Sequence, residues 1–175
     1  MTRFLLCTLM LSGCADPCEG ADLWVGGACI HSHGYDVDVD MIEATIEIVE
    51  DDFNARTLNT ADIDLNRMLV DYRVSIEFVE TLPTFPNKNG EFNYYTDTIY
   101  IRAFFRRPLL TQGDRCFNLY AWALSHELLH FLDDEVIGHK GHWTPYLWNK
   151  WALDTGYEGL TVESTARQHI RNLCY

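Results

Sequence analysis

The segment SHELLHF, Ser125–Phe131, places three ionisable side chains in an otherwise apolar stretch. His126 and His130 are four positions apart, so on a helix their imidazoles lie on the same face, one turn apart. At this spacing both rings can reach one metal ion at about 2.0–2.1 Å. Glu127 can accept a proton from a zinc-bound water, whose pKa the ion lowers to about 7. The segment therefore predicts a zinc ion, Zn²⁺, held by both histidines, with Glu127 as general base.

The surrounding residues predict that this helix is buried. Nearly every position from Leu119 to Leu132 is apolar, and a helix that is apolar on all sides is usually an interior one. Burying unpartnered polar groups costs on the order of several kcal/mol, and coordination of a metal ion offsets that cost. The alternative is that the histidines make hydrogen bonds in the core while Glu127 pairs with Arg106 or Arg107.

The HELLH pattern, on a helix that follows two predicted strands, resembles the HExxH motif of the zincin metallopeptidases. The resemblance covers only about thirty residues around this motif. It implies that His126 and His130 are zinc ligands and that Glu127 is the general base. It also implies that the predicted strand Asp97–Phe104 binds a peptide substrate in extended form.

The third zinc ligand is not given by this motif alone. Metzincins continue as HExxHxxGxxH, but Asp133 and Val136 stand at the glycine and histidine positions here. A histidine that follows a short loop and leads into a helix with an aromatic residue is similar to the SprT-like zincins. This resemblance favours His142, which directly precedes Trp143.

Other residues remain open as the third ligand or as its support. His139 lies in the same short segment, GHKGHW. Glu163, on a later predicted helix, is similar to the helical glutamate ligand of the gluzincins. Asp133 and Asp134 follow the motif closely and are candidates for orienting a ligand histidine as hydrogen-bond acceptors.

The order of predicted elements indicates an α+β domain over residues 41–175. We expect a small, mainly antiparallel sheet packed on helices, with the HExxH helix buried. Apolar residues at helical spacing predict a helix from Met41 to about Leu58, and alternation predicts strands at Arg73–Glu80 and Asp97–Phe104. A loop is expected at 83–93, and further helices at 62–69, at 115–132 with Asp114 as N-cap, from Pro145 onward, and at 161–173.

The composition limits the classes of partner. The chain has 175 residues, 47% of them apolar, and a formal net charge of −13, which is typical of a globular domain with an acidic surface. Nucleic acid binds to Lys/Arg patches, and the sequence contains no basic run, so nucleic acid is not expected as a partner. The oligomeric state is left open.

The N-terminus has the layout of an export signal. Arg3 precedes an apolar run, Phe4–Leu11, that is too short to span a bilayer as a helix. The LSGC sequence that ends at Cys14 resembles the lipobox of bacterial lipoproteins, which implies that residues 1–13 are removed and that Cys14 carries lipid. Ala15 after it is similar to the pattern of outer-membrane lipoproteins. The alternative is an ordinary cleaved signal.

Four cysteines follow the lipobox, and an even number in an exported chain predicts two disulfides. The favoured pairs are Cys18–Cys29 and Cys116–Cys174, the second of which would tie the C-terminus to the central helix. The first pair lies within residues 14–40, which are expected to be a lipid-anchored, loop-rich lead-in.

Two classes of function fit these features. The first is a zinc metallopeptidase, a hydrolase in which Glu127 assists the attack of zinc-bound water on a peptide bond, exposed on a membrane-anchored lipoprotein. The alternative is a non-enzymatic envelope lipoprotein that binds a partner or holds a structural zinc. A closed structural site would use His126, His130, His139 and His142, whereas a catalytic site leaves one position for water.

Overall fold

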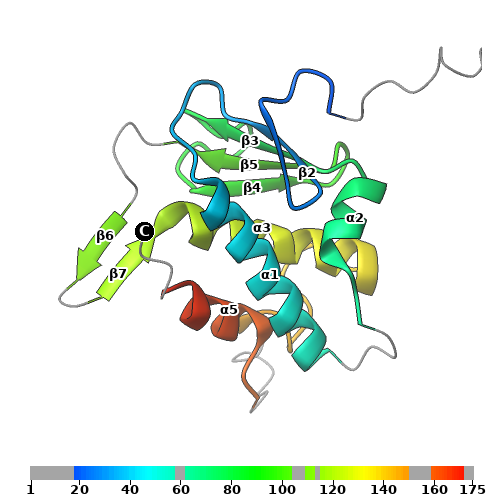
Figure 1. The fold of residues 1–175 in the computed structure, drawn as a ribbon. Helices are drawn as coiled ribbons and strands as arrows, with labels where there is room; N and C mark the ends of the chain where they lie inside the picture. The colour runs from blue at the N-terminus through cyan, green and yellow to red at the C-terminus, as the bar shows by residue number, and fades with distance from the viewer. Residues whose placement is uncertain (1–17, 58–61, 104–108, 113–114, 150–158, 172–175) are drawn as a thin grey trace, which may run out of the picture.

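The computed structural model of the chain describes residues 18–57, 62–103, 109–112, 115–149 and 159–171. A five-stranded sheet has the strand order β1-β2-β3-β5-β4, and a separate hairpin is formed by β6 and β7. Helices α1, α3 and α5 lie on one side of the sheet (Figure 1). The strands are β1 (Leu23–Val25), β2 (Ala28–His31), β3 (Ser75–Val79), β4 (Gly90–Asn93), β5 (Thr98–Arg102), β6 (Leu109–Gln112) and β7 (Arg115–Asn118). The helices are α1 (Val39–Arg56), α2 (Leu65–Asp71), α3 (Leu119–Leu132), the π-helix η1 (Asp133–Ile137) and α5 (Val162–Ile170).

The α+β class predicted from the sequence is confirmed. Three of the five strand pairings among the described residues are antiparallel, namely β1–β2, β4–β5 and β6–β7, whereas β2–β3 and β3–β5 are parallel. In β3 the buried Ile76 and Phe78 alternate with half-buried residues, as expected for a strand with one face against helices. Because β5 lies between β3 and β4, strand β4 forms one edge of the sheet.

Side-chain caps fix where the helices begin. Asp38 accepts a hydrogen bond from the N–H of Met41 at the start of α1, and Thr161 accepts one from the N–H of Ser164 at the start of α5. Such caps satisfy backbone donors that have no partner within the helix. The predicted helix from Met41 to about Leu58 is confirmed as α1, whose buried face includes Ile42, Ile46, Val49 and Phe53.

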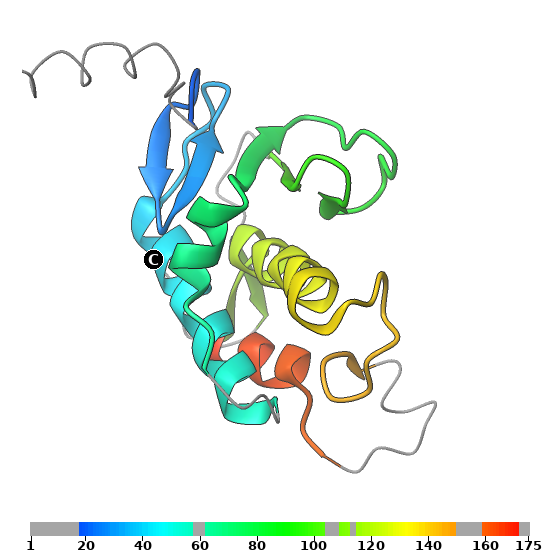
Figure 2. The same cartoon turned by 90° about the vertical axis from the view of Figure 1, so that its right-hand side faces the viewer.

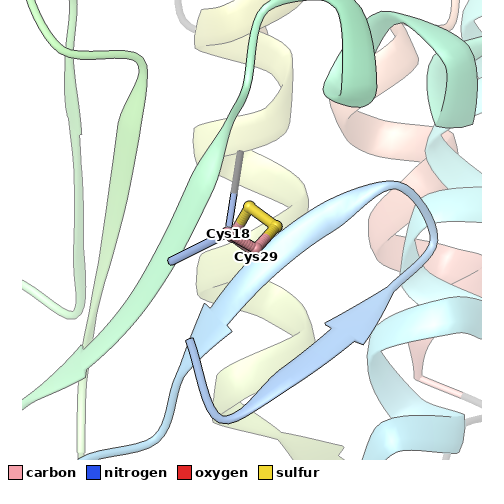
Figure 3. The surroundings of a disulfide bond; sticks show 2 residues. All are labelled: Cys18 and Cys29. Atoms are coloured by element: carbon pink, nitrogen blue, oxygen red, sulfur yellow. A yellow bond between two sulfur atoms is a disulfide. The ribbon is translucent and has the colours of Figure 1, made fainter. Parts of the chain in front are cut away.

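The N-terminal lead-in differs from the loop-rich segment expected over residues 14–40. Within its described part, β1 and β2 form a hairpin, and β2 pairs with β3 in the main sheet. Ala28 and Ile30 of β2 are fully buried in the core. The predicted Cys18–Cys29 disulfide is confirmed and fastens the chain to β2 (Figure 3). This part therefore belongs to the folded domain, because its short strand gains stability from long-range pairing that local sequence does not reveal.

The central helix begins later than predicted. Arg115–Asn118 form β7, and α3 starts at Leu119, with the Asn118 side chain accepting from the N–H groups of Tyr120 and Ala121. The N-cap is therefore Asn118 and not Asp114, which lies outside the described residues. The loop expected at 83–93 likewise ends in a strand, β4, because residues 90–93 pair with β5.

The segment after α3 continues as η1 and ends at Gly138, which has a left-handed backbone conformation (φ 80°). Residues from Pro145 to Leu147 form a turn, and most of the helix predicted after Pro145 lies outside the described residues, as does the predicted Cys116–Cys174 disulfide. The last predicted helix is confirmed as α5. Within the described parts of the chain, no helix combines the length and the apolar character needed to cross a membrane.

Candidate metal centre

Helix α3 carries the HELLH motif through the interior of the domain. It packs against β4 and β5 of the sheet and against α1 and α5, and Figure 2 shows it between the sheet and α5, with the chain after η1 passing beside it. Glu127 and His130 are buried, and His126 is half-buried. The predicted burial of this helix is therefore confirmed, and two of its three ionisable side chains, Glu127 and His130, are largely shielded from solvent.

His142 joins the two helical histidines in one group. The ligand nitrogens of His126, His130 and His142 all lie within 4.8 Å of one another. The Nε2 atoms of His126 and His142 are 3.2 Å apart, and the ring centroids of His130 and His142 are 4.6 Å apart. Three converging imidazole nitrogens can hold a metal ion, so the donor set fits the predicted cofactor, although it does not identify the metal.

The second nitrogen of each helical histidine already has a protein partner. His126 Nδ1 lies 3.3 Å from Oε1 of Glu163, and His130 Nδ1 lies 3.0 Å from the hydroxyl oxygen of Tyr94. In metal sites a ligand histidine usually donates the N–H of its other ring nitrogen to such an acceptor, which fixes the tautomer and the ring orientation. Both rings are thus held with Nε2 left for a ligand bond.

Asp133 holds the segment that delivers His142. Its carboxylate is fully buried and accepts hydrogen bonds from the Thr144 hydroxyl at 2.6 Å and the Trp148 Nε1–H at 2.8 Å. The indole of Trp148 in turn lies against all three histidine rings, with centroid distances of 5.1 Å to His126, 4.6 Å to His130 and 4.4 Å to His142. Asp133 therefore supports the group through Trp148 and Thr144 and does not contact a ligand histidine in the way the sequence suggested.

Glu127 lies beside the histidines, against the edge strand β4. The backbone N–H of Phe92 donates a hydrogen bond to its carboxylate. A Cβ added to Gly90 would lie 2.7 Å from Oε1 and 2.8 Å from Cγ of Glu127, so the close approach of strand and carboxylate depends on glycine at this position. Burial raises the pKa of Glu127 to about 7, with the nearby His126 opposing this rise.

The electrostatics of the site favour a neutral His130 and a charged Glu163. Burial lowers the pKa of His130 to about 2, with further contributions from His126 and His142, so this ring is in the neutral form that binds metals. Burial also tends to raise the pKa of Glu163. The hydrogen bond with His126 and the charge of Arg167 outweigh burial, so the pKa of Glu163 lies below its ordinary value. Glu163 therefore faces His126 as an anion.

A pocket of about 560 Å³ opens beside this group. This volume lies within the ordinary range for small-molecule and peptide sites, about 300–1,000 Å³. His126, Glu127, His130 and His142 all line it, so the histidine nitrogens and the carboxylate are accessible from one cavity. The remaining walls come from the loop before β4, from β4 itself and from the start of α3, and include Phe85, Lys88, Phe92 and Trp122.

The structure separates the alternatives for the third ligand. His142 lies in the group, whereas His139 is exposed and its Nδ1 lies 3.2 Å from the Thr144 hydroxyl. Glu163 faces the Nδ1 of His126, so it takes a supporting position and is absent from the group of three. Asp134 pairs with Lys140 at 3.6 Å. That His126, His130 and His142 bind zinc stays a prediction.

That the predicted strand Asp97–Phe104 binds a substrate stays a prediction. Strand β5, within the predicted segment Asp97–Phe104, is an interior strand, whereas β4 lies at the edge and lines the pocket. Strand β4 was not predicted, because its residues lie at the end of a segment, 83–93, whose Pro, Asn and Gly are typical of a loop. Arg106 and Arg107, the alternative partners of Glu127, lie outside the described residues.

Tyr94, Asp133 and Trp148 complete the surroundings of the histidines. None of them is marked as a site residue by the HExxH spacing, although Asp133 was a candidate support. Tyr94 could have been predicted as a site residue only if the turn between β4 and β5 had been recognised in the sequence. Trp148 has the sequence context of an ordinary packing residue. The geometry of the site carries the functional argument for this chain, since no family model, curated protein or solved structure matches it.

Proposed function

We propose that this protein is a zinc-dependent metallopeptidase in which Glu127 is the general base. One observation carries the proposal: three histidines converge within 4.8 Å, and a buried carboxylate that is not part of the ligand group lines the same pocket. A purely structural metal site has no need of this carboxylate. Hydrolysis by a metal site needs such a proton acceptor beside the ligands.

The number of histidines supports a site with an open position. A closed structural site would require His139 as a fourth ligand, but its ring contacts Thr144 and stands outside the group of three. The pocket also gives the group access to solvent. These two features favour catalysis over the alternative of a structural zinc.

Each residue has a distinct part in the proposed reaction. When bound, Zn²⁺ supplies a Lewis acid that polarises a carbonyl oxygen and lowers the pKa of a coordinated water to about 7. Glu127 takes a proton from the attacking water and passes it to the amine that leaves when the peptide bond breaks. The N–H of Phe92 holds the carboxylate of Glu127 in place between these two transfers. Glu163 and Tyr94 hold the rings of His126 and His130.

The expected location of the domain rests on its N-terminal sequence, which ends in LSGC at Cys14. We place the domain on a membrane surface, held by lipid on Cys14, and the resemblance of its N-terminus to a lipobox followed by Ala15 favours the bacterial outer membrane. The Cys18–Cys29 disulfide supports export, because disulfides persist in oxidising compartments. Cys18 follows Cys14 by four positions, a length of chain that spans at most about 14 Å. Labelling of cells with a radioactive fatty acid, with Cys14→Ala as the control, tests this location.

Metal content is the first test of the site. The domain from residue 15 onward is purified oxidised and without added metal, and its zinc is measured together with that of His130→Ala. We expect about one zinc per chain, which the variant loses, because three imidazole ligands give a specific site. A folded protein that takes up no zinc on titration would contradict the proposal.

Catalysis is tested by Glu127→Gln, which keeps the shape of the side chain but cannot accept a proton. With labelled casein and a mixture of fluorogenic peptides as probes, we expect the hydrolysis rate to fall about 10²–10⁴-fold while zinc content is unchanged. Glu80→Gln, on an exposed residue, is the matched control. Equal rates for Glu127→Gln and the wild type would rule out the proposed mechanism.

A further inference from the structure

Tyr94 lies in the turn between β4 and β5, and its hydroxyl contacts two segments that carry candidate ligands. The hydroxyl oxygen is 3.0 Å from Nδ1 of His130 on α3. It also accepts a hydrogen bond from the backbone N–H of Gly141 at 3.2 Å, and Gly141 directly precedes His142 in the sequence. One phenol therefore joins a ligand on the helix to the loop that delivers another.

Counting donors and acceptors defines the state of this contact. A tyrosine hydroxyl has one donor and two acceptor lone pairs, and the Gly141 N–H uses one lone pair. When His130 binds a metal through Nε2, its Nδ1 must carry the proton, and that N–H donates to the second lone pair of Tyr94. The hydroxyl oxygen can thus accept both hydrogen bonds at once, and its own proton remains available.

The ring of Tyr94 is itself held from two sides. Its edge packs against the ring of Phe92 with a centroid distance of 4.9 Å. The ammonium of Lys140 lies 5.3 Å from the centre of the Tyr94 ring, a favourable cation–π distance. Lys140 and Gly141 are consecutive, so the loop before His142 contacts both the face and the hydroxyl of the same side chain.

We propose that Tyr94 is a positioning residue of the metal centre. Its hydroxyl holds His130 in the tautomer with the proton on Nδ1 and fixes the loop of His142 at the distance that lets the three imidazoles converge. This inference rests on the proposed metal site and adds to it a residue that the HExxH motif does not contain. The residue acts through the ligands and needs no contact with metal or substrate.

Tyr94→Phe tests the hydroxyl alone, because it retains the ring, the contact with Phe92 and the contact with Lys140. Tyr95→Phe is the matched control: its neighbouring ring also lies near Lys140, at 5.9 Å, but it is 94% exposed. Zinc affinity of each purified variant is measured by competition with a chromophoric chelator. We expect Tyr94→Phe to weaken zinc binding about 10–100-fold, the usual effect of removing a partner of a ligand histidine, and Tyr95→Phe to bind like the wild type.

Two further measurements distinguish positioning from a general structural effect. In the His142→Ala background, Tyr94→Phe should cost less zinc affinity than in the wild type, because part of its task has disappeared. In the unsubstituted protein loaded with zinc, ¹⁵N chemical shifts of His130 should report a protonated Nδ1 and a coordinated Nε2. This last measurement does not depend on the folding of any variant.

The possible outcomes separate this inference from the proposed function. If the wild type binds no zinc, the metal centre itself is refuted. If the wild type binds zinc but Tyr94→Phe and Tyr95→Phe bind it equally well, the metal centre stands and the role of Tyr94 is overturned. Coordination of His130 through Nδ1 would overturn that role as well, because the hydroxyl would then face the wrong nitrogen.

Discussion

His126 and His142 approach within 3.2 Å of each other through their Nε2 atoms, although one lies on α3 and the other in a loop after η1. Such a close approach of two imidazole nitrogens is favourable when they share an ion or when one of them carries a proton for the other. The relationship makes His142, and not His139, the third candidate ligand. His139 and His142 lie in the same six-residue segment, GHKGHW, so a variant of one serves as the control for a variant of the other.

We expect His142→Ala to weaken zinc binding at least about 100-fold, because loss of a ligand should cost no less than loss of a partner that merely orients one. His139→Ala should leave binding within about twofold of the wild type, since its ring contacts Thr144 instead. Calorimetric titration of both variants with zinc provides the comparison. If zinc affinity fell more in His139→Ala than in His142→Ala, the loop would have to adopt another arrangement when metal is bound.

Glu163 gives a prediction for the support of His126. Glu163→Gln replaces the charged acceptor at Nδ1 of His126 by a neutral amide, and zinc affinity is expected to fall about 10–100-fold. Gln168→Ala, on an exposed residue of the same helix, is the control and should not change affinity. If Glu163→Gln abolished zinc binding entirely while the protein remained folded, Glu163 would be a direct ligand. Its contact with Nδ1 of His126 would then belong only to the metal-free protein.

Gly90 gives a prediction about catalysis alone. The Cβ of Gly90→Ala would lie 2.7 Å from Oε1 of Glu127, so the buried carboxylate has to move. A displacement of about 1 Å can cost about 100-fold in rate, and we expect a loss of this size in hydrolysis with zinc affinity unchanged. Gly90→Ser adds the same Cβ and should lose at least as much. Full activity of both variants would place Glu127 outside the reaction.

Asp133 gives a prediction about stability. Asp133→Ala removes the acceptor of the buried Trp148 N–H and of the buried Thr144 hydroxyl, which keeps only its contact with Nδ1 of His139. Each buried group that loses its acceptor costs about 1–3 kcal/mol, so the free energy of unfolding should fall by about 3 kcal/mol. Urea denaturation of the variant and the wild type measures this difference. Asp134→Ala, which removes a pair with the exposed Lys140, should change it by less than about 1 kcal/mol. Equal losses in the two variants would mean that the buried hydrogen bonds contribute little.

The Cys18–Cys29 disulfide closes a short loop, with a sequence separation of 11. Its loss in the double variant Cys18→Ala/Cys29→Ala is expected to lower the free energy of unfolding by about 3 kcal/mol, because the unfolded chain gains freedom. The site lies on other elements, so zinc affinity of the folded variant should remain. Chemical unfolding of the oxidised proteins, side by side, measures this difference. A variant as stable as the wild type would show that β2 is fastened by pairing alone.

Local sequence predicted the helices of this domain better than its strands. The helix α1 follows from apolar residues at helical spacing, and α5 lies within the helix predicted at 161–173. Strands β3 and β5 follow from alternation. Strands β2 and β4 were not predicted, and both are short. Strand β2 pairs with β3, a partner far along the chain, which the local pattern does not contain. Strand β4 pairs with β5 across a short turn, but its residues belong to a segment whose Pro, Asn and Gly are typical of a loop.

The sequence by itself determined the spacing of His126, Glu127 and His130, because a helix converts four positions into one turn. It also supplied several candidates for the third ligand, among which only a family resemblance favoured His142. The tertiary structure places His142, and not His139, beside the two helical histidines. The position of His142 depends on Asp133, Trp148 and Tyr94, which act through contacts between elements that are distant in sequence. A residue on a loop has no fixed periodicity, so only the packing that holds the loop can place its side chain.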